Sequence, residues 1–173
     1  GIGWGAERPL NAHLPRVRLV PDEFATIQSA IDSAERGDMI RVAGGTYTGG
    51  LVLSDYVSIY GGYDPGFTVR DPELYPTVID AAGSGNVVTC EGNDHVIIDG
   101  FELRNSGATS YGVFARNSGI TIRDCDIHHA WRGIGLVSGS GTPTDYGAFI
   151  DFCRIHDNTG VGIFINDPEN PDL

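Results

Sequence analysis

Only one stretch of the chain has the hydrophobic spacing of an amphipathic helix. Apolar residues recur there at intervals of three and four, as one helical face requires, at Ile27, Ala30, Ile31 and Ala34. Asp22 or Thr26 can cap the amino end of this segment, and Gly37 lies just beyond its carboxyl end. The pattern therefore predicts one helix of about three turns within residues 21–37.

The rest of the chain carries short apolar stretches separated by Gly, Asn, Asp and Ser, which is typical of strands joined by turns. Before the helix, residues 16–20 alternate between polar and apolar and predict a short edge strand. Beyond Gly37 the apolar stretches lie at 39–42, 51–53, 57–60, 78–79, 87–90, 96–98, 113–115, 120–122, 134–137, 148–150 and 161–165. Because sandwiches, barrels and repeat proteins share this pattern, an internal repeat decides between them.

Three ten-residue segments repeat without an internal gap, at 96–105, 120–129 and 148–157. Their first residues lie 24 and 28 positions apart (96 to 120, then 120 to 148). In each segment the first and third residues are predicted to point inward, and the next inward pair begins after three residues instead of two. Because side chains alternate between the two faces of a strand, this change of phase marks a corner of the chain.

A third strand accompanies each segment, led by Gly112-Val113, Gly133-Ile134 and Gly160-Val161. Three short strands and two corners in a unit of about 21–28 residues describe one coil of a parallel β-helix, in which each coil contacts only its neighbours. Antiparallel hairpins would not place the change of phase at the same position three times. We therefore predict an all-β, parallel β-helix with a short amino-terminal capping helix.

Residues 25–34, followed by 37–42 and 45–47, resemble the amino-terminal cap and first coil of the pectin lyase-like right-handed β-helix proteins. Residues 57–61 and 96–100 resemble the next coils, so the resemblance covers about residues 20–166. It implies a right-handed, single-stranded parallel β-helix whose short helix covers one end of the core. It implies no single activity, because these proteins include polysaccharide lyases, hydrolases, esterases, epimerases, phage tailspikes and non-catalytic surface proteins.

The catalytic signatures of that superfamily are missing from this sequence. The Asn-Thr-Asp, Asp-Asp and Gly-His-Gly motifs of polygalacturonases do not occur. Residues 63–66 come nearest to the Asp-Pro-His motif of alginate epimerases, but Gly66 stands where the histidine should be. Residues 61–66 are better interpreted as a turn, and no catalytic residue is carried over by motif.

The outward positions of the repeat gather polar side chains into three columns, Glu102/Asp126/Arg154, Arg104/His128/His156 and Asn105/His129/Asp157. Neighbouring strands lie about 4.8 Å apart, so side chains within a column can interact. In an enzyme, Asp126, His128, Arg154 and His156 could abstract a proton from a sugar ring while arginine neutralises a uronate. The alternative is a ladder of opposite charges that holds neighbouring coils in register.

Two further groups are candidates for binding. Trp131 and Arg132, with the nearby His129, could form a platform on which a sugar ring stacks, although a surface tryptophan without a ligand is the alternative. Asp124 and Asp126 are candidate calcium ligands, since calcium prefers oxygen donors, but no spacing matches a dedicated calcium loop. The sequence predicts no cofactor, although calcium could bind at these carboxylates.

Cys125 and Cys153 fall in one inward column, about 4.8 Å apart, which lies within the range that a disulfide bridges. They could equally be two buried thiols that pack as small hydrophobic groups. The third cysteine, Cys90, is expected to be buried and free. Because no CxxC pair occurs, the sequence does not indicate a zinc site.

Charge and composition restrict the partners. The 173 residues include 23 Asp and Glu against 11 basic residues, all of them Arg, and the formal net charge is −12. Such an acidic chain lacks the positively charged surface that would attract nucleic acids or anionic membranes. No apolar run approaches the roughly 18 residues that span a bilayer. We therefore expect an extracellular or cell-surface protein whose partner is a polysaccharide or another protein subunit.

The pattern divides the chain into an extension with the edge strand (1–20), the capping helix (21–37), the coils (38–166) and a tail (167–173). No helix or polar cap is predicted after the last strand, so we expect an open carboxyl-terminal end. Either the sequence is part of a longer β-helix, or another subunit stacks on that end.

Three functions fit these observations. The first is a secreted or cell-surface β-helix domain with a structural or binding role, towards carbohydrate or a neighbouring subunit. The second is a polysaccharide-active enzyme, namely a uronate lyase, epimerase or hydrolase. The third is a subunit of an extracellular filament that stacks end to end.

Overall fold

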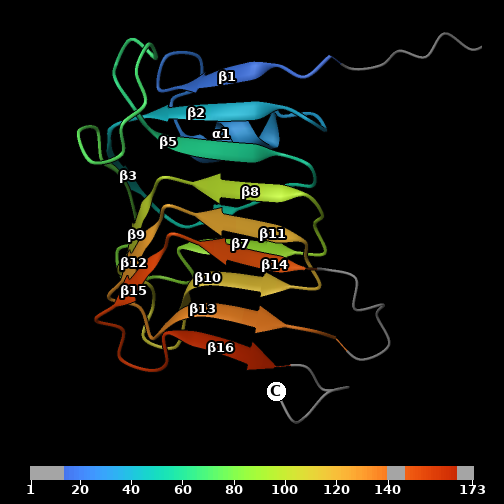
Figure 1. The fold of residues 1–173 in the computed structure, drawn as a ribbon, viewed down its shortest axis with the longest axis vertical. Helices are drawn as coiled ribbons and strands as arrows, with labels where there is room; N and C mark the ends of the chain where they lie inside the picture. The colour runs from blue at the N-terminus through green and yellow to red at the C-terminus, as the bar shows by residue number, and fades with distance from the viewer. Residues whose placement is uncertain (1–13, 140–146, 167–173) are drawn as a thin grey trace, which may run out of the picture.

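The computed structural model describes residues 14–139 and 147–166, so most of the predicted extension and the whole predicted tail lie outside the described residues. The chain winds through three parallel sheets, and successive turns stack from one end to the other (Figure 1). Sheet A contains β1 (Val17–Val20), β2 (Met39–Ala43), β5 (Ser58–Tyr63), β8 (Val96–Asp99), β11 (Ile120–Arg123) and β14 (Ala148–Asp151). Sheet B contains β3 (Gly45–Thr48), β6 (Thr77–Asp80), β9 (Glu102–Arg104), β12 (Asp126–His128) and β15 (Arg154–His156). Sheet C contains β4 (Leu51–Val52), β7 (Val88–Glu91), β10 (Tyr111–Arg116), β13 (Arg132–Val137) and β16 (Ile163–Asn166).

The register of the strands confirms the predicted parallel β-helix and its repeat. Ile122 pairs with Ile98 on one side and with Ile150 on the other, as the alignment of the three segments requires. The predicted edge strand is β1, which pairs in parallel with β2 at the end of sheet A. One strand starts later than predicted, because Ile163 and not Val161 pairs with Ile134. The shift is two residues, so the same face still points inward.

Single residues in the left-handed conformation make the corners of the repeat. At the first corner they are Gly100, Asp124 and Phe152, with φ of 78°, 48° and 51°. At the second corner they are Asn105, His129 and Asp157, with φ of 57°, 53° and 50°. Asn, Asp and His enter this conformation more readily than most side chains, and glycine has no Cβ to oppose it. These residues produce the change of phase seen in the sequence.

The core is the stack of inward side chains between the three sheets. The predicted inward residues of the first two repeat segments are buried, because each of these turns has a neighbour on both sides. They include Ile98, Leu103, Ile122 and Ile127. In the last described turn Ile150 and Ile155 are only partly buried, and Ala148 is exposed. Each turn thus buries its apolar side chains against its two neighbours.

The helix is present but shorter than the three turns predicted. Helix α1 (Ile27–Asp32) begins after Thr26, whose side chain and that of Ser29 form a capping box, and it buries Ile27, Ala30 and Ile31 against the first turn. It ends early because the Asp38 carboxylate accepts the Glu35 N–H at 3.1 Å, which competes with a further helical turn. In the described residues no helix has the length and apolar character that crossing a bilayer requires.

Residues 64–76 form an insertion between β5 and β6. The Asp64 carboxylate accepts the N–H groups of Thr68 and Val69 at 2.6 and 2.7 Å, and the Phe67 N–H donates to the Asp64 carbonyl at 2.9 Å, so the turn lies at 64–67. It starts later than the predicted turn at 61–66, because residues 61–63 belong to β5. The Arg70 guanidinium pairs with the buried Asp99, and its Nε donates to the Gly61 carbonyl at 2.9 Å. The insertion is thereby attached to sheet A next to the first corner.

Candidate functional site

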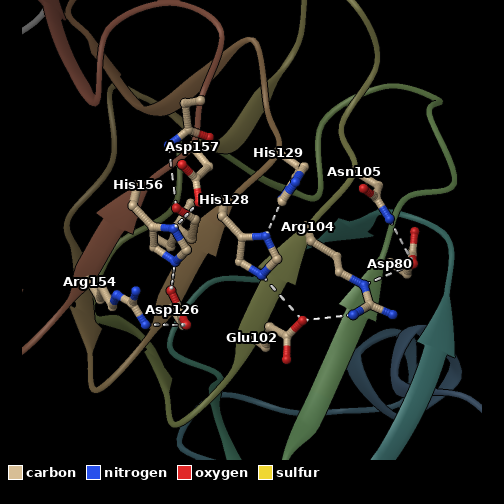
Figure 2. A network of polar contacts seen from close by, with 12 residues as sticks. Asp80, Glu102, Arg104, Asn105, Asp126, His128, His129, Arg154, His156 and Asp157 are labelled. Carbon is tan, nitrogen blue, oxygen red and sulfur yellow. Dashed lines mark hydrogen bonds and ion pairs between the residues drawn. The ribbon is translucent and has the colours of Figure 1, made fainter.

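A network of polar side chains covers the outer face of sheet B and the corner that follows it (Figure 2). The register places Arg104 beside Asp80 on one side and beside His128 on the other, and His128 beside His156. The predicted outward columns therefore exist and lie side by side. The members are Asp80, Glu102, Arg104, Asn105, Asp126, His128, His129, Arg154, His156 and Asp157.

Arg104 ties two carboxylates together at one end of the network. Its Nη1 donates to Glu102 Oε1 at 2.8 Å and its Nε donates to Asp80 Oδ2 at 3.0 Å. Burial by itself would raise the pKa of Asp80. Hydrogen bonds from the Ala82 N–H, the Asn105 amide and Arg104 outweigh this effect, so the pKa of Asp80 is lowered.

Asp80 was not among the predicted site residues, although its spacing from Arg104 matches the repeat. Asp80 precedes Arg104 by 24 residues, which equals the spacing from Arg104 to His128. The insertion at 64–76 separates Asp80 from the strand of sheet A in its own turn, and the ten-residue repeat is therefore not visible there.

His128 occupies the centre of the network. Its Nε2 lies 3.2 Å from Glu102 Oε1, and its Nδ1 contacts Nδ1 of His129. The ring stacks on that of His156, with the ring centres 5.1 Å apart. Only 13% of the His128 side chain is exposed, so it is enclosed by its protein partners.

His156 lies between two carboxylates at the other end of the network. Its Nδ1 is 2.8 Å from Asp157 Oδ2 and its Nε2 is 2.7 Å from Asp126 Oδ1. The pKa of His156 is raised, chiefly by the Asp157 hydrogen bond and further by Asp126, against partial desolvation. The pKa of Asp157 is lowered by the same hydrogen bond. Since both ring nitrogens face carboxylates, the imidazolium form is favoured.

The His156–Asp157 pair is expected to stabilise the fold most between the pKa values of the two groups. The pKa of His156 is raised above 6.5, so its contribution is complete below about pH 6.5 and is lost as pH rises through the raised value. The pKa of Asp157 is lowered below 3.8, so its contribution is lost only as pH falls through the lowered value. Urea unfolding of wild type and His156→Gln should differ more at pH 5.5 than at pH 9. Equal differences at both values would contradict the pairing.

The four residues predicted as catalytic are gathered on this face as partners of one another. Both ring nitrogens of His128 and of His156 contact protein groups, whereas a general base needs a free nitrogen. Arg154 lies at the margin, 3.9 Å from Asp126 and with 74% of its side chain exposed. These contacts favour the ladder of opposite charges.

A groove of about 410 Å³ follows the corner between sheets B and C. His129 and Trp131 line it together, so the structure brings these two predicted binding residues into one site. His129 is exposed, and the contact from its Nδ1 to His128 leaves its Nε2 without a hydrogen bond to any described residue. Trp131 is half-buried, although its place at a turn predicts an exposed side chain. We call this site the Trp131 groove; its polar wall is formed by Asn105, His129, Asp157 and Thr159.

Arg132 is not among the residues that line the Trp131 groove, and its guanidinium lies in an aromatic cluster. Its guanidinium lies 4.0 Å from the centre of the Trp131 ring system and 3.9 Å from that of Phe164. Its Nη1 donates to the Tyr111 hydroxyl at 3.1 Å. The Tyr111 ring lies over Gly135, where a Cβ would come within 2.4 Å of it. Phe164 was not among the predicted binding residues. Its position between the inward-facing Ile163 and Ile165 nevertheless predicts an outward side chain.

The calcium candidates lie at the opposite corner of sheet B. Asp124 and Asp126 both line a groove of about 520 Å³. Asp71 and Glu73 line the same groove, and so do Arg70 and Arg154, whose guanidinium groups offset part of the negative charge. Among residues 14–139 and 147–166, no three His, Cys, Asp or Glu side chains are grouped so as to hold a metal ion.

Cys125 and Cys153 are neighbours in the inward column, as predicted, and both are free thiols, so the structure contains no disulfide between them. A hydrogen bond from the Cys125 thiol lowers the pKa of Cys153 to about 7. Burial raises the pKa values of Cys125 and Cys90. The three cysteines therefore differ sharply in thiolate content at neutral pH.

Cys153 is expected to be alkylated first when native protein meets iodoacetamide at pH 7.5. The thiolate is the reactive form, and Cys153 has the lowest pKa and is only partly buried. Peptide mass spectrometry after a short reaction should find the label on Cys153 and little on Cys90 or Cys125. Cys153→Ser is the control and should remove the fast phase; a label of equal extent on all three would contradict the assignment.

Comparison with known proteins supports the fold. Residues 86–171, about half of the chain, match the family described as "Right handed beta helix region". No curated protein and no solved structure matches the chain. The matched residues contain the turns from β7 to β16, whose sheets are all parallel. Family match and strand topology agree, and the chain is a right-handed parallel β-helix protein.

Proposed function

We propose that this β-helix domain binds carbohydrate in the Trp131 groove, at the cell surface or outside the cell. The observation that carries the proposal is the composition of the groove. The Trp131 ring system lines it together with an amide, an imidazole, a carboxylate and a hydroxyl group, at Asn105, His129, Asp157 and Thr159. Sugar rings offer an apolar face to aromatic side chains and hydroxyl groups to polar ones, so such a site suits a saccharide.

The aromatic side of the groove is held in place before a ligand arrives. Trp131 packs against the Arg132 guanidinium and meets the Tyr111 ring edge to face, with the ring centres 5.8 Å apart. Its backbone N–H donates to the Ser106 hydroxyl at 3.3 Å. A side chain already restricted in this way loses little conformational entropy on binding, which favours affinity.

A binding role has more support than the enzymatic alternative. Each imidazole of the predicted catalytic set donates to or accepts from protein groups at both nitrogens. A polyuronate would also approach a chain with a formal net charge of −12. End-to-end assembly stays a separate prediction, which light scattering of the native protein tests.

The test is a binding measurement on the full chain with neutral and acidic hexasaccharides, such as xylohexaose, cellohexaose and hexagalacturonate. Wild type is expected to bind at least one of them by isothermal titration calorimetry. Trp131→Ala should weaken that binding at least tenfold. Phe149→Ala, which removes another aromatic ring that is 55% exposed, is the matched control and should bind as wild type does. No binding by wild type, or unchanged binding by Trp131→Ala, would overturn the proposal.

A further inference from the structure

The hydrogen bonds around His129 restrict which saccharide the Trp131 groove accepts. Resting on the proposed carbohydrate site, we propose that Glu102 acts through His128 to make His129 Nε2 a hydrogen-bond acceptor that faces the groove. A ligand must then supply a donor at this point, so the groove takes a neutral hydroxylated sugar in preference to a uronate. Glu102 and His128 are positioning residues, and only His129 contacts the sugar.

The first step is the tautomer of His128. Glu102 Oε1 receives Arg104 Nη1 at 2.8 Å, a charge-assisted contact that favours the ionised carboxylate. An ionised carboxylate can only accept hydrogen bonds, so His128 Nε2, at 3.2 Å, carries the proton of that contact. In the neutral ring, His128 Nδ1 is therefore an acceptor.

The second step is the tautomer of His129. Nδ1 of His129 faces Nδ1 of His128, and two facing nitrogens form a hydrogen bond only when one of them carries a proton. Because His128 Nδ1 is the acceptor, His129 Nδ1 is the donor. The proton of neutral His129 is then on Nδ1, and the lone pair is on Nε2. No described residue contacts that Nε2, whose ring lines the groove.

The neighbours of the two rings fit this arrangement. His156 is held as an imidazolium between Asp126 and Asp157, and its ring stacks on His128 with the ring centres 5.1 Å apart. Protons on both facing Nδ1 atoms would place two donors face to face, so only one of these nitrogens carries a proton. The ionisable groups around the pair, from every neighbouring strand and corner, are Asp80, Glu102, Arg104, Asp126, Arg154, His156 and Asp157.

The ligand class follows from the polar wall. His129 Nε2 offers a lone pair, and the Asp157 carboxylate lies on the same groove with 71% of its side chain exposed. Both groups accept hydrogen bonds from hydroxyl groups, and both disfavour a carboxylate, which has no proton to donate. Arg132, which could have neutralised a uronate, is instead enclosed by Trp131 and Phe164.

The tautomer can be measured without any ligand. Nitrogen-15 NMR of the histidine rings at pH 8 should show the proton of neutral His129 on Nδ1, whereas free histidine prefers Nε2. Glu102→Leu, which removes the acceptor of the His128 Nε2–H, should shift His129 towards the ordinary Nε2–H form. Glu91→Leu, on an exposed ion pair of sheet C, is the matched control and should leave His129 unchanged. An Nε2–H tautomer in wild type would overturn the proposal.

Binding then tests the ligand class. At pH 8 the neutral hexasaccharides are expected to bind at least tenfold more tightly than hexagalacturonate. Glu102→Leu should weaken binding of the neutral sugar about threefold to tenfold, and lowering the pH until His129 is protonated should weaken binding to wild type. A preference for hexagalacturonate would overturn this inference and leave the proposed function intact. Failure of every sugar to bind would overturn both, whatever the tautomer.

Discussion

Replacing Phe101 with alanine is expected to lower the free energy of unfolding by about 3–5 kcal/mol, the usual cost of removing a buried phenylalanine. Phe101 is 2% exposed and stands in the inward column with Cys125, at the corner between β8 and β9. Its ring fills the space between neighbouring turns, and the strands around it are held by parallel pairing on both sides. The surroundings cannot close over the cavity without breaking that register. Urea unfolding followed by circular dichroism measures the loss.

Phe152→Ala is the matched control for this substitution. Phe152 belongs to the same corner two turns later but is 80% exposed, so its removal creates no cavity. Its replacement should change the free energy of unfolding by less than about 0.5 kcal/mol. If Phe101→Ala were as mild as Phe152→Ala, the inward column would not be the source of stability that we describe.

Replacing Arg70 with methionine is expected to lower the free energy of unfolding by about 3 kcal/mol, because it leaves a buried carboxylate without its partner. Asp99 is 5% exposed and pairs with the Arg70 guanidinium, whose Nε also donates to the Gly61 carbonyl. The Arg70 side chain passes beside Gly100, where a Cβ would lie 2.4 Å from its Nη2. The corner glycine therefore makes room for the ion pair. Equilibrium unfolding in urea at pH 7 gives the difference.

Two variants separate the buried charge from the loss of contacts. Arg70→Met combined with Asp99→Asn removes both charges and should recover at least half of the lost stability, since the uncompensated carboxylate is gone. Arg123→Met removes an exposed ion pair with Asp151 at 3.9 Å and should cost less than about 1 kcal/mol. A double variant no more stable than the single one would contradict the account of Asp99.

Much of this architecture follows from local rules that the sequence shows. Strand side chains alternate, and parallel turns stack in register, so a change of phase at the same point in three segments predicts both corners and columns. Ile98, Ile122 and Ile150 pair as that alignment requires. The outward neighbours Glu102, Asp126 and Arg154 follow from the same alternation.

The helix and the site depended on a local hydrogen bond and an insertion that hydrophobic spacing does not describe. The hydrophobic spacing from Ile27 to Ala34 fits a longer helix, but the Asp38 carboxylate takes the Glu35 N–H. The repeat did not reveal Asp80 because the 64–76 insertion interrupts its turn. In the first case a polar side chain three residues away ends the helix, and in the second an insertion breaks the repeated spacing.

The sequence alone determined the β-helix, its inward columns and the gathering of charged side chains on sheet B, because these depend on alternation and on a repeated spacing. The tertiary structure decided which charged groups meet, that Arg132 is enclosed by Trp131 and Phe164, and that His129 is the imidazole with a free nitrogen towards a groove. The reason is physical. Alternation gives the face on which a side chain lies, whereas its hydrogen bonds depend on its rotamer and on neighbours supplied by other turns.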